Sequence, residues 1–192
     1  TRAWVVARPL SGFAETFSQY IVEVGAGGGS TKPDTDEDAQ SVIFVVEGGA
    51  TLTIDGQSHT LSEGSYAYIP VTSEWAFKND TGTPCRFHWI RKAYDWVDGI
   101  DAPPAFVTND ADVAPTEMPD TDGAWATTRF VDPMDMRHDM AVTIVTFQPG
   151  GVIPFLETHV MEHGLYVLEG KAVYNLNNDW VEVEAGDFMW LR

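Results

Sequence analysis

The chain has 192 residues, enough for one larger domain or two small ones, and its hydrophobic share of 44% is enough to bury a core. It carries 29 acidic and 11 basic residues, a net charge of −18. Such a charge repels phosphate backbones and anionic lipid headgroups, so we expect neither a nucleic acid nor a membrane partner. Cys85 is the single cysteine, and no apolar run approaches a membrane span, so we expect a cytoplasmic protein.

Strand patterns dominate the first half of the chain. Residues 41–70 contain short β-branched and aromatic runs, separated by the turn signals Gly48-Gly49, Asp55-Gly56 and Glu63-Gly64. Asp-Gly between alternating segments is typical of a two-residue hairpin. The segment after Pro70 predicts about two further strands. No stretch has a capped 3.6-residue apolar period, so helices should be short and few.

A segment rich in Pro, Asp and Gly follows at residues 98–124 and lacks a periodic apolar face. Such composition is typical of a connection between domains. We therefore predict an N-terminal domain at 1–97, a connection at 98–130 and a C-terminal domain at 131–192.

The chain also contains an internal repeat. Shifted by 122 positions, residues 46–70 align with 168–192 without a gap, and the alignment extends to about 13–70 with 135–192. Turn glycines coincide, as in Gly48 with Gly170 and Gly64 with Gly186. This predicts a duplicated β unit. The strands after Pro70 have no counterpart after Arg192, so the second unit is expected to lack its closing strands in the chain as given.

Three potential metal ligands lie together in the second copy: Glu157, His159 and His163. On an extended strand they share one face, where a carboxylate and two imidazoles could bind Zn, Fe(II) or Mn. Residues 159–163 also match H-x-x-E-H, a zinc-peptidase pattern that requires a helix. Gly164 and β-type residues follow at once, which favours a strand. Glu162 is then expected to point away from the metal, toward solvent.

The spacing of these residues resembles the first cupin motif, with a glutamate and a histidine exchanged. The matching positions are Gly151, Glu157, His159, His163 and Gly170, and Gly64, Pro70 and Asn79 match the second motif in the first copy. The resemblance implies an all-β bicupin, that is, two jelly-roll type double-stranded β-helix barrels from a duplicated unit, the second incomplete at its C-terminus. In the first barrel the ligand positions hold Thr35, Glu37, Ser41 and Trp75, which predicts a degenerate, metal-free barrel.

The E-x-H-x3-H variant resembles the (S)-ureidoglycine aminohydrolase family of glyoxylate-induced bicupins in purine (allantoin) catabolism. The resemblance implies a hydrolase that uses Mn²⁺, rather than Fe²⁺ or Zn²⁺, to release ammonia from (S)-ureidoglycine and give (S)-ureidoglycolate. It implies that Glu157, His159 and His163 bind the metal and that Tyr174 contacts the substrate, with a fourth ligand, a glutamine, expected near position 197. A small-molecule substrate and a homo-oligomer are the expected partners.

Two other functions remain open at this stage. One is a different metal-dependent bicupin enzyme, such as an Fe(II) dioxygenase or an isomerase, because a fold does not determine a chemistry. The other is a non-enzymatic cupin that binds a metabolite. Catalytic residues beyond the metal site cannot be assigned from the sequence.

Overall fold

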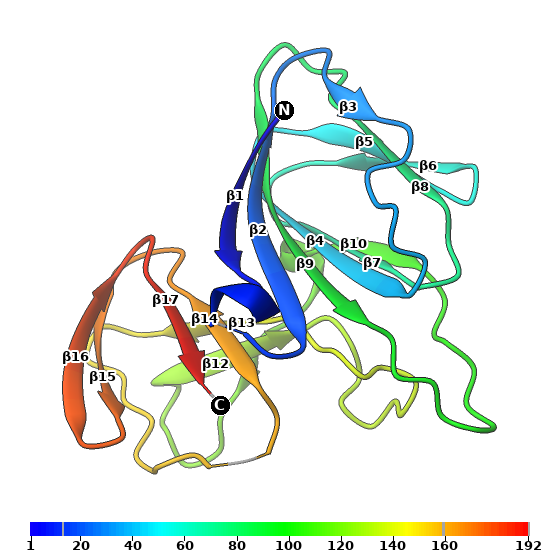
Figure 1. Ribbon diagram of the computed structural model, residues 1–192. Helices are drawn as coiled ribbons and strands as arrows, with labels where there is room; N and C mark the ends of the chain where they lie inside the picture. Colours follow the sequence, from blue (N-terminus) through cyan, green and yellow to red (C-terminus); the bar gives the residue numbers. More distant parts are fainter. Residues whose placement is uncertain (13, 159, 192) are drawn as a thin grey trace.

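The computed structural model describes residues 1–12, 14–158 and 160–191, and the described chain is all-β (Figure 1). Its only helices in these ranges are two single 3-10 turns, η1 (Pro9–Ser11) and η2 (Asp110–Asp112). The expectation of few, short helices is confirmed. No helix in the described ranges has the length and apolar character that a membrane crossing requires.

The first unit consists of strands β1–β10, arranged in two sheets. One sheet has six antiparallel strands in the order β1-β2-β9-β4-β7-β10, and the other has four in the order β3-β8-β5-β6. The bounds are β1 (Arg2–Ala7), β2 (Phe17–Val24), β3 (Gly29–Ser30), β4 (Ala39–Glu47), β5 (Ala50–Ile54), β6 (Gln57–Leu61), β7 (Ser65–Ile69), β8 (Trp75–Lys78), β9 (Cys85–Ala93) and β10 (Phe106–Asn109). The two strands predicted after Pro70 are β8 and β9.

Both faces of the central strands of the six-stranded sheet are buried: β7 is buried throughout, and β4 is buried from Gln40 to Val45. Ile43 and Val45 on β4 face the four-stranded sheet and form the barrel core with Leu52 and Phe77. The intervening Val42 and Phe44 face the opposite side. There they form a second core with Tyr66, Tyr68 and Ile90 from the sheet and with Phe130, Met140, Val142 and Ile144 from the second half of the chain.

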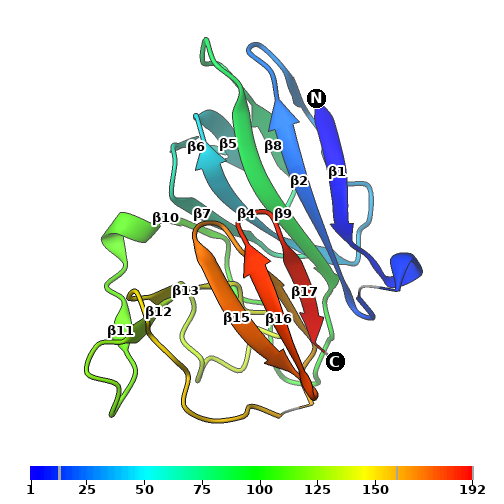
Figure 2. The same ribbon diagram turned by 90° about the vertical axis from the view of Figure 1, so that its left-hand side faces the viewer.

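The second unit consists of strands β11–β17 and lies beside the lower end of the first (Figures 1 and 2). The bounds are β11 (Thr116–Glu117), β12 (Trp125–Arg129), β13 (Thr143–Phe147), β14 (His163–Tyr166), β15 (Lys171–Leu176), β16 (Asp179–Glu184) and β17 (Phe188–Leu191). They form the sheets β11-β12-β13, β14-β17 and β15-β16. The segment predicted as a connection therefore contains paired strands, since β10 pairs with β7 and β12 with β13. The domain boundaries themselves stay a prediction.

Strand registers repeat at the 122-residue offset seen in the sequence. The β4–β7 pair Ser41↔Ile69 corresponds to the β14–β17 pair His163↔Leu191. The β5–β6 pair Ala50↔Leu61 corresponds to the β15–β16 pair Ala172↔Val183. The described parts of both units thus share one strand arrangement, as expected of a duplication and consistent with two barrels.

Candidate functional site

The sheet β14-β17 has two distinct faces. Directly paired residues share a face, so His163 and Leu165 lie with Leu191 and Met189. Met189 is buried, with 6% of its surface exposed, and it lines a hollow of about 480 Å³ inside the second unit. His163, the first residue of β14, is therefore on the sheet face that is directed into the second unit.

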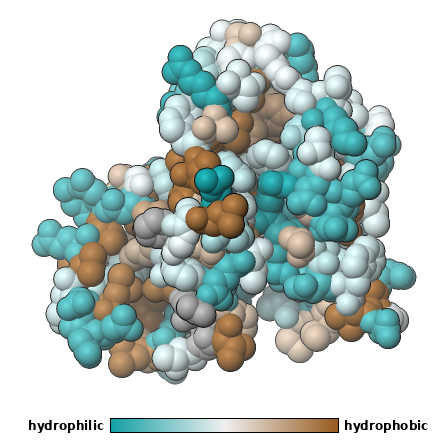
Figure 3. Space-filling view, in the orientation of Figure 1, coloured by the Kyte–Doolittle hydropathy of each residue, from teal (hydrophilic) through white to brown (hydrophobic). Residues whose placement is uncertain are grey.

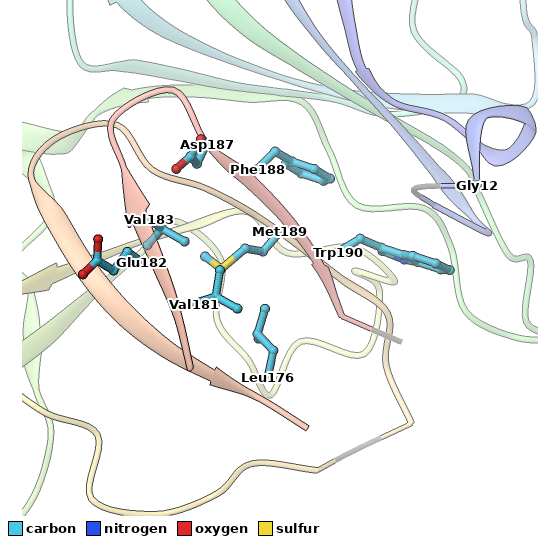
Figure 4. A pocket seen from close by; sticks show the side chains of 9 residues that line it. All are labelled: Gly12, Leu176, Val181, Glu182, Val183, Asp187, Phe188, Met189 and Trp190. Carbon is cyan, nitrogen blue, oxygen red and sulfur yellow. The ribbon is translucent and has the colours of Figure 1, made fainter. Parts of the chain in front are cut away.

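The hollow is formed mainly by β15, β16 and β17. Its lining residues are Gly12, Leu176, Val181, Glu182, Val183, Asp187, Phe188, Met189 and Trp190. Figure 4 shows Leu176, Val181 and Met189 converging on one side of β17, whereas Phe188 and Trp190 point to the other side, toward Gly12. The apolar converging side chains make one wall of the hollow poorly hydrated.

Tyr174 lies on the face of β15 that is directed toward this hollow. It pairs with Val181 and is two residues from Leu176, and both of these line the hollow. Burial raises the pKa of Tyr174 above its ordinary value, and the negative charge of Glu157 raises it further. The charge of Glu157 thus reaches Tyr174, which links two residues that the sequence singled out.

The ligand segment itself differs from the sequence prediction. The described residues of 157–162 form neither strand nor helix, and the strand begins only at His163. Glu157 is exposed in this irregular segment. The alternation that put three ligands on one extended face therefore does not hold there. The pairing of β14 with β17 stops at His163, which faces Leu191, and the residues before it have no strand partner in the described ranges.

His159 lies outside the described residues, so the complete set of Glu157, His159 and His163 stays a prediction. The search for three clustered ligand side chains covered only the described residues and found none. The donor chemistry still fits a divalent metal, because a carboxylate and an imidazole are ligands for Mn, Fe and Zn alike.

Glu162 is not a solvated side chain, and this corrects the sequence prediction. Its carboxylate accepts hydrogen bonds from the backbone N–H of Glu15, from the backbone N–H of Thr16 (2.8 Å) and from Thr16 Oγ1 (2.6 Å). Trp190 Nε1 donates a fourth (2.6 Å). Burial opposes ionisation, but these hydrogen bonds outweigh it and lower the pKa of Glu162. Three of the four donors come from the first unit and the fourth from β17 of the second; the orientation of Glu162 relative to the ligands stays a prediction.

In the first unit, aromatic side chains surround the position equivalent to His163. Ser41 is buried there, and its Oγ accepts a hydrogen bond from Trp89 Nε1 (3.0 Å). The Trp89 ring packs against Trp75, with ring centroids 5.6 Å apart, and against Tyr20. The positions equivalent to Glu157 and His159 hold Thr35 and Glu37, which are exposed. That the first unit binds no metal stays a prediction.

Comparison with known proteins places this geometry in context. The sequence profile of the Cupin domain matches residues 20–91 and 143–192. The chain is 30% identical over 189 residues to (S)-ureidoglycine aminohydrolase of Escherichia coli strain K12, covering 98% of this chain and 70% of the relative. A crystal structure of a protein described as glyoxylate-induced, from Pseudomonas aeruginosa, is 67% identical with a TM-score of 0.93, covering all of this chain and 72% of that one. Protein Ylba from E. coli has a TM-score of 0.84 at 30% identity, covering 98% and 73%.

Proposed function

We propose that this chain, which belongs to the (S)-ureidoglycine aminohydrolase family of cupin proteins, catalyses the hydrolytic release of ammonia from (S)-ureidoglycine to give (S)-ureidoglycolate. The observation that carries the proposal is a similarity to the E. coli enzyme that extends over nearly the whole chain. In the reaction the bond between Cα and the amine breaks, a Cα–O bond forms from water, and the amine leaves as ammonia.

Glu157, His159 and His163 would hold the metal, which we propose to be Mn²⁺. Two observations support this assignment. His163 is on the inward face of β14, beside Met189, and the charge of Glu157 acts on Tyr174. When bound, such a metal supplies a Lewis acid and a template for the substrate's carboxylate and amine.

Tyr174 would orient the substrate. Because its pKa is raised, the phenol stays protonated at neutral pH and can donate one hydrogen bond while accepting another. The effect of the Glu157 charge on Tyr174 supports a hydroxyl group within reach of that predicted ligand. The apolar side chains of Leu176, Val181 and Met189 would keep bulk water away from one side of the substrate.

Alanine substitution of the histidines tests the proposal. His163→Ala and His159→Ala should each abolish tight Mn²⁺ binding and ammonia release, because loss of one imidazole leaves too few donors to hold the ion tightly. Metal content is measured by elemental analysis of the full-length protein, and ammonia release is measured with freshly generated ureidoglycine. His59→Ala, on β6 of the first unit, is the control and should retain both properties.

Two outcomes would contradict the proposal. Retention of Mn²⁺ and turnover in either variant would show that the site is elsewhere. Oxygen consumption with bound iron, in place of ammonia release, would favour a dioxygenase on the same fold.

A further inference from the structure

One hydrogen bond within each unit follows the same 122-residue offset as the strands. In the first unit Tyr68 Oη donates a hydrogen bond to Gln40 Oε1 (2.9 Å). In the second unit the residues at the equivalent positions are Trp190 and Glu162, and Trp190 Nε1 donates to Glu162 Oε1 (2.6 Å). Each pair joins the residue just before a ligand position to an aromatic residue on the neighbouring strand.

Gln40 and Glu162 each also form hydrogen bonds with the opposite unit. Gln40 Nε2 donates to Asp139 Oδ1, which lies ahead of β13. Glu162 accepts from Glu15 and Thr16, which lie just ahead of β2, the strand equivalent to β13. The two contacts are therefore similar but not identical: Gln40 and Glu162 occupy equivalent positions and each binds the opposite unit near the start of equivalent strands.

The two positions differ in their hydrogen-bonding chemistry. Gln40 uses its amide both as a donor and as an acceptor. Glu162 accepts in all four of its hydrogen bonds, two at each carboxylate oxygen, a role that an ionised carboxylate fills and an amide cannot. Ser41, after Gln40, offers no metal ligand, whereas His163, after Glu162, is a predicted one.

The first unit also packs closely against Gly164, the residue after His163. A Cβ at Gly164 would lie 2.6 Å from a ring carbon of Phe17 and 2.9 Å from one of Phe188. The chain before His163 is held by Glu162 and the chain after it is packed by Phe17. Because the described residues of 157–162 are irregular and have no strand partner, these contacts are what can fix the start of β14.

We propose that Glu162 is a positioning residue for the metal site: its carboxylate fixes the backbone at His163 by binding Glu15, Thr16 and Trp190. This role rests on the proposed function, since it presumes that His163 is a ligand. With this role for Glu162, the first unit contributes to the site, because residues 15 and 16 supply three of the four donors.

Glu162→Gln tests the role with almost no change in volume. The amide presents an NH₂ group to two of the four donors, so the fixed backbone should loosen. Mn²⁺ alone is titrated into the metal-free full-length protein and followed by electron paramagnetic resonance. We expect affinity to fall about tenfold or more, the range seen when residues that orient metal ligands are replaced. Hydrogen exchange at the amides of Glu15 and Thr16 should quicken in the same variant.

Glu169→Gln is the matched control, because Glu169 is an exposed carboxylate in the same unit. It should leave Mn²⁺ affinity unchanged. Thr16→Val removes only the hydroxyl donor and should weaken binding less than Glu162→Gln does. Thr16→Ser restores the hydroxyl group and should restore the affinity. If Glu162→Gln does not fold, these two variants still test the positioning role of Glu162.

The outcomes separate this inference from the proposed function. Wild-type Mn²⁺ affinity in Glu162→Gln, together with faster exchange at residues 15 and 16, would overturn the positioning role alone. An unaltered affinity in Thr16→Val would count against it as well if Glu162→Gln does not fold. Mn²⁺ binding that survives His163→Ala would overturn the metal site itself.

Discussion

His88 is a buried imidazole at the junction of the two units. On β9 its Nδ1 lies 3.1 Å from Gln19 Nε2, and its ring packs edge-on against Tyr166 of β14, with ring centroids 4.5 Å apart. Burial lowers the pKa of His88 to about 4, because the charged form would lose its hydration. The side chain is therefore neutral in the folded protein at neutral pH.

This pKa predicts how stability depends on pH. Between about pH 6.5 and pH 4 the unfolded chain takes up a proton at His88 and the folded chain does not, so the free energy of unfolding should fall as the pH falls. The shift corresponds to about 3 kcal/mol across that window. His88→Asn keeps an acceptor for Gln19 and cannot titrate, so its stability should decline less between pH 6.5 and 4. Urea unfolding at several pH values measures the difference, and parallel curves would refute the assignment.

Hairpin turns show how local sequence sets the elements. Asp55-Gly56 joins β5 to β6 with positive φ at both residues (48° and 81°), the geometry of a type I′ turn. Its counterpart Asn177-Asn178 joins β15 to β16, and only Asn177 has a positive φ (56°). The two hairpins keep the same register with different turns, because both turns place two residues between paired strands.

Two glycines in the first unit allow the energetic cost of backbone strain to be distinguished from that of a steric clash. Gly48 and Gly56 have similar positive φ values, 76° and 81°. A Cβ at Gly56 would meet nothing within 4 Å, whereas one at Gly48 would lie 2.3 Å from the carbonyl oxygen of Pro84. Gly56→Ala should therefore cost about 1–2 kcal/mol for the left-handed backbone alone. Gly48→Ala should cost clearly more, and equal losses in thermal or urea unfolding would contradict this reasoning.

At the scale of the whole molecule, the second unit buries the outer face of the six-stranded sheet. Phe130 is central to this contact, since its ring stacks on Tyr66 with centroids 4.1 Å apart and also meets Phe44. Elsewhere the second unit exposes apolar side chains, and brown areas are visible at the lower left of Figure 3. Val173 and Trp180 are exposed there, at positions where the first unit has Thr51 and Ser58.

Phe130→Ala should weaken the packing between the two units. Loss of the ring should lower the free energy of unfolding by roughly 2–3 kcal/mol, near the low end for buried phenylalanines because Phe130 is only partly buried. Urea unfolding, followed by fluorescence and by circular dichroism, should then separate into two transitions. Phe155→Ala, at an exposed phenylalanine in the second unit, is the control and should change stability by less than about 0.5 kcal/mol. A similar loss in both variants would contradict the role of Phe130.

The sequence by itself determined the all-β class, the turns and the duplication, because these depend on short-range patterns. Strand alternation and turn residues act over a few positions, and a gapless offset carries strand register from one copy to the other. The structure agrees, since the pair Ser41↔Ile69 recurs at that offset as His163↔Leu191. The family resemblance likewise followed from the motif spacing and agrees with the relatives found by comparison.

Only the tertiary structure decided how the ligand segment is held. Residue parity predicted an extended strand through 157–163, but a strand needs a hydrogen-bonding neighbour, and β14 gains one only from His163 onward. The same alternation predicted that Glu162 turns away from the ligands and toward solvent, but Glu162 is hydrogen-bonded and its partners could not be foreseen. Thr16 is 146 residues away in the chain, and Trp190 reaches Glu162 only because β17 pairs with β14. Hydrogen bonds across such separations depend on packing between the units, which no local pattern encodes.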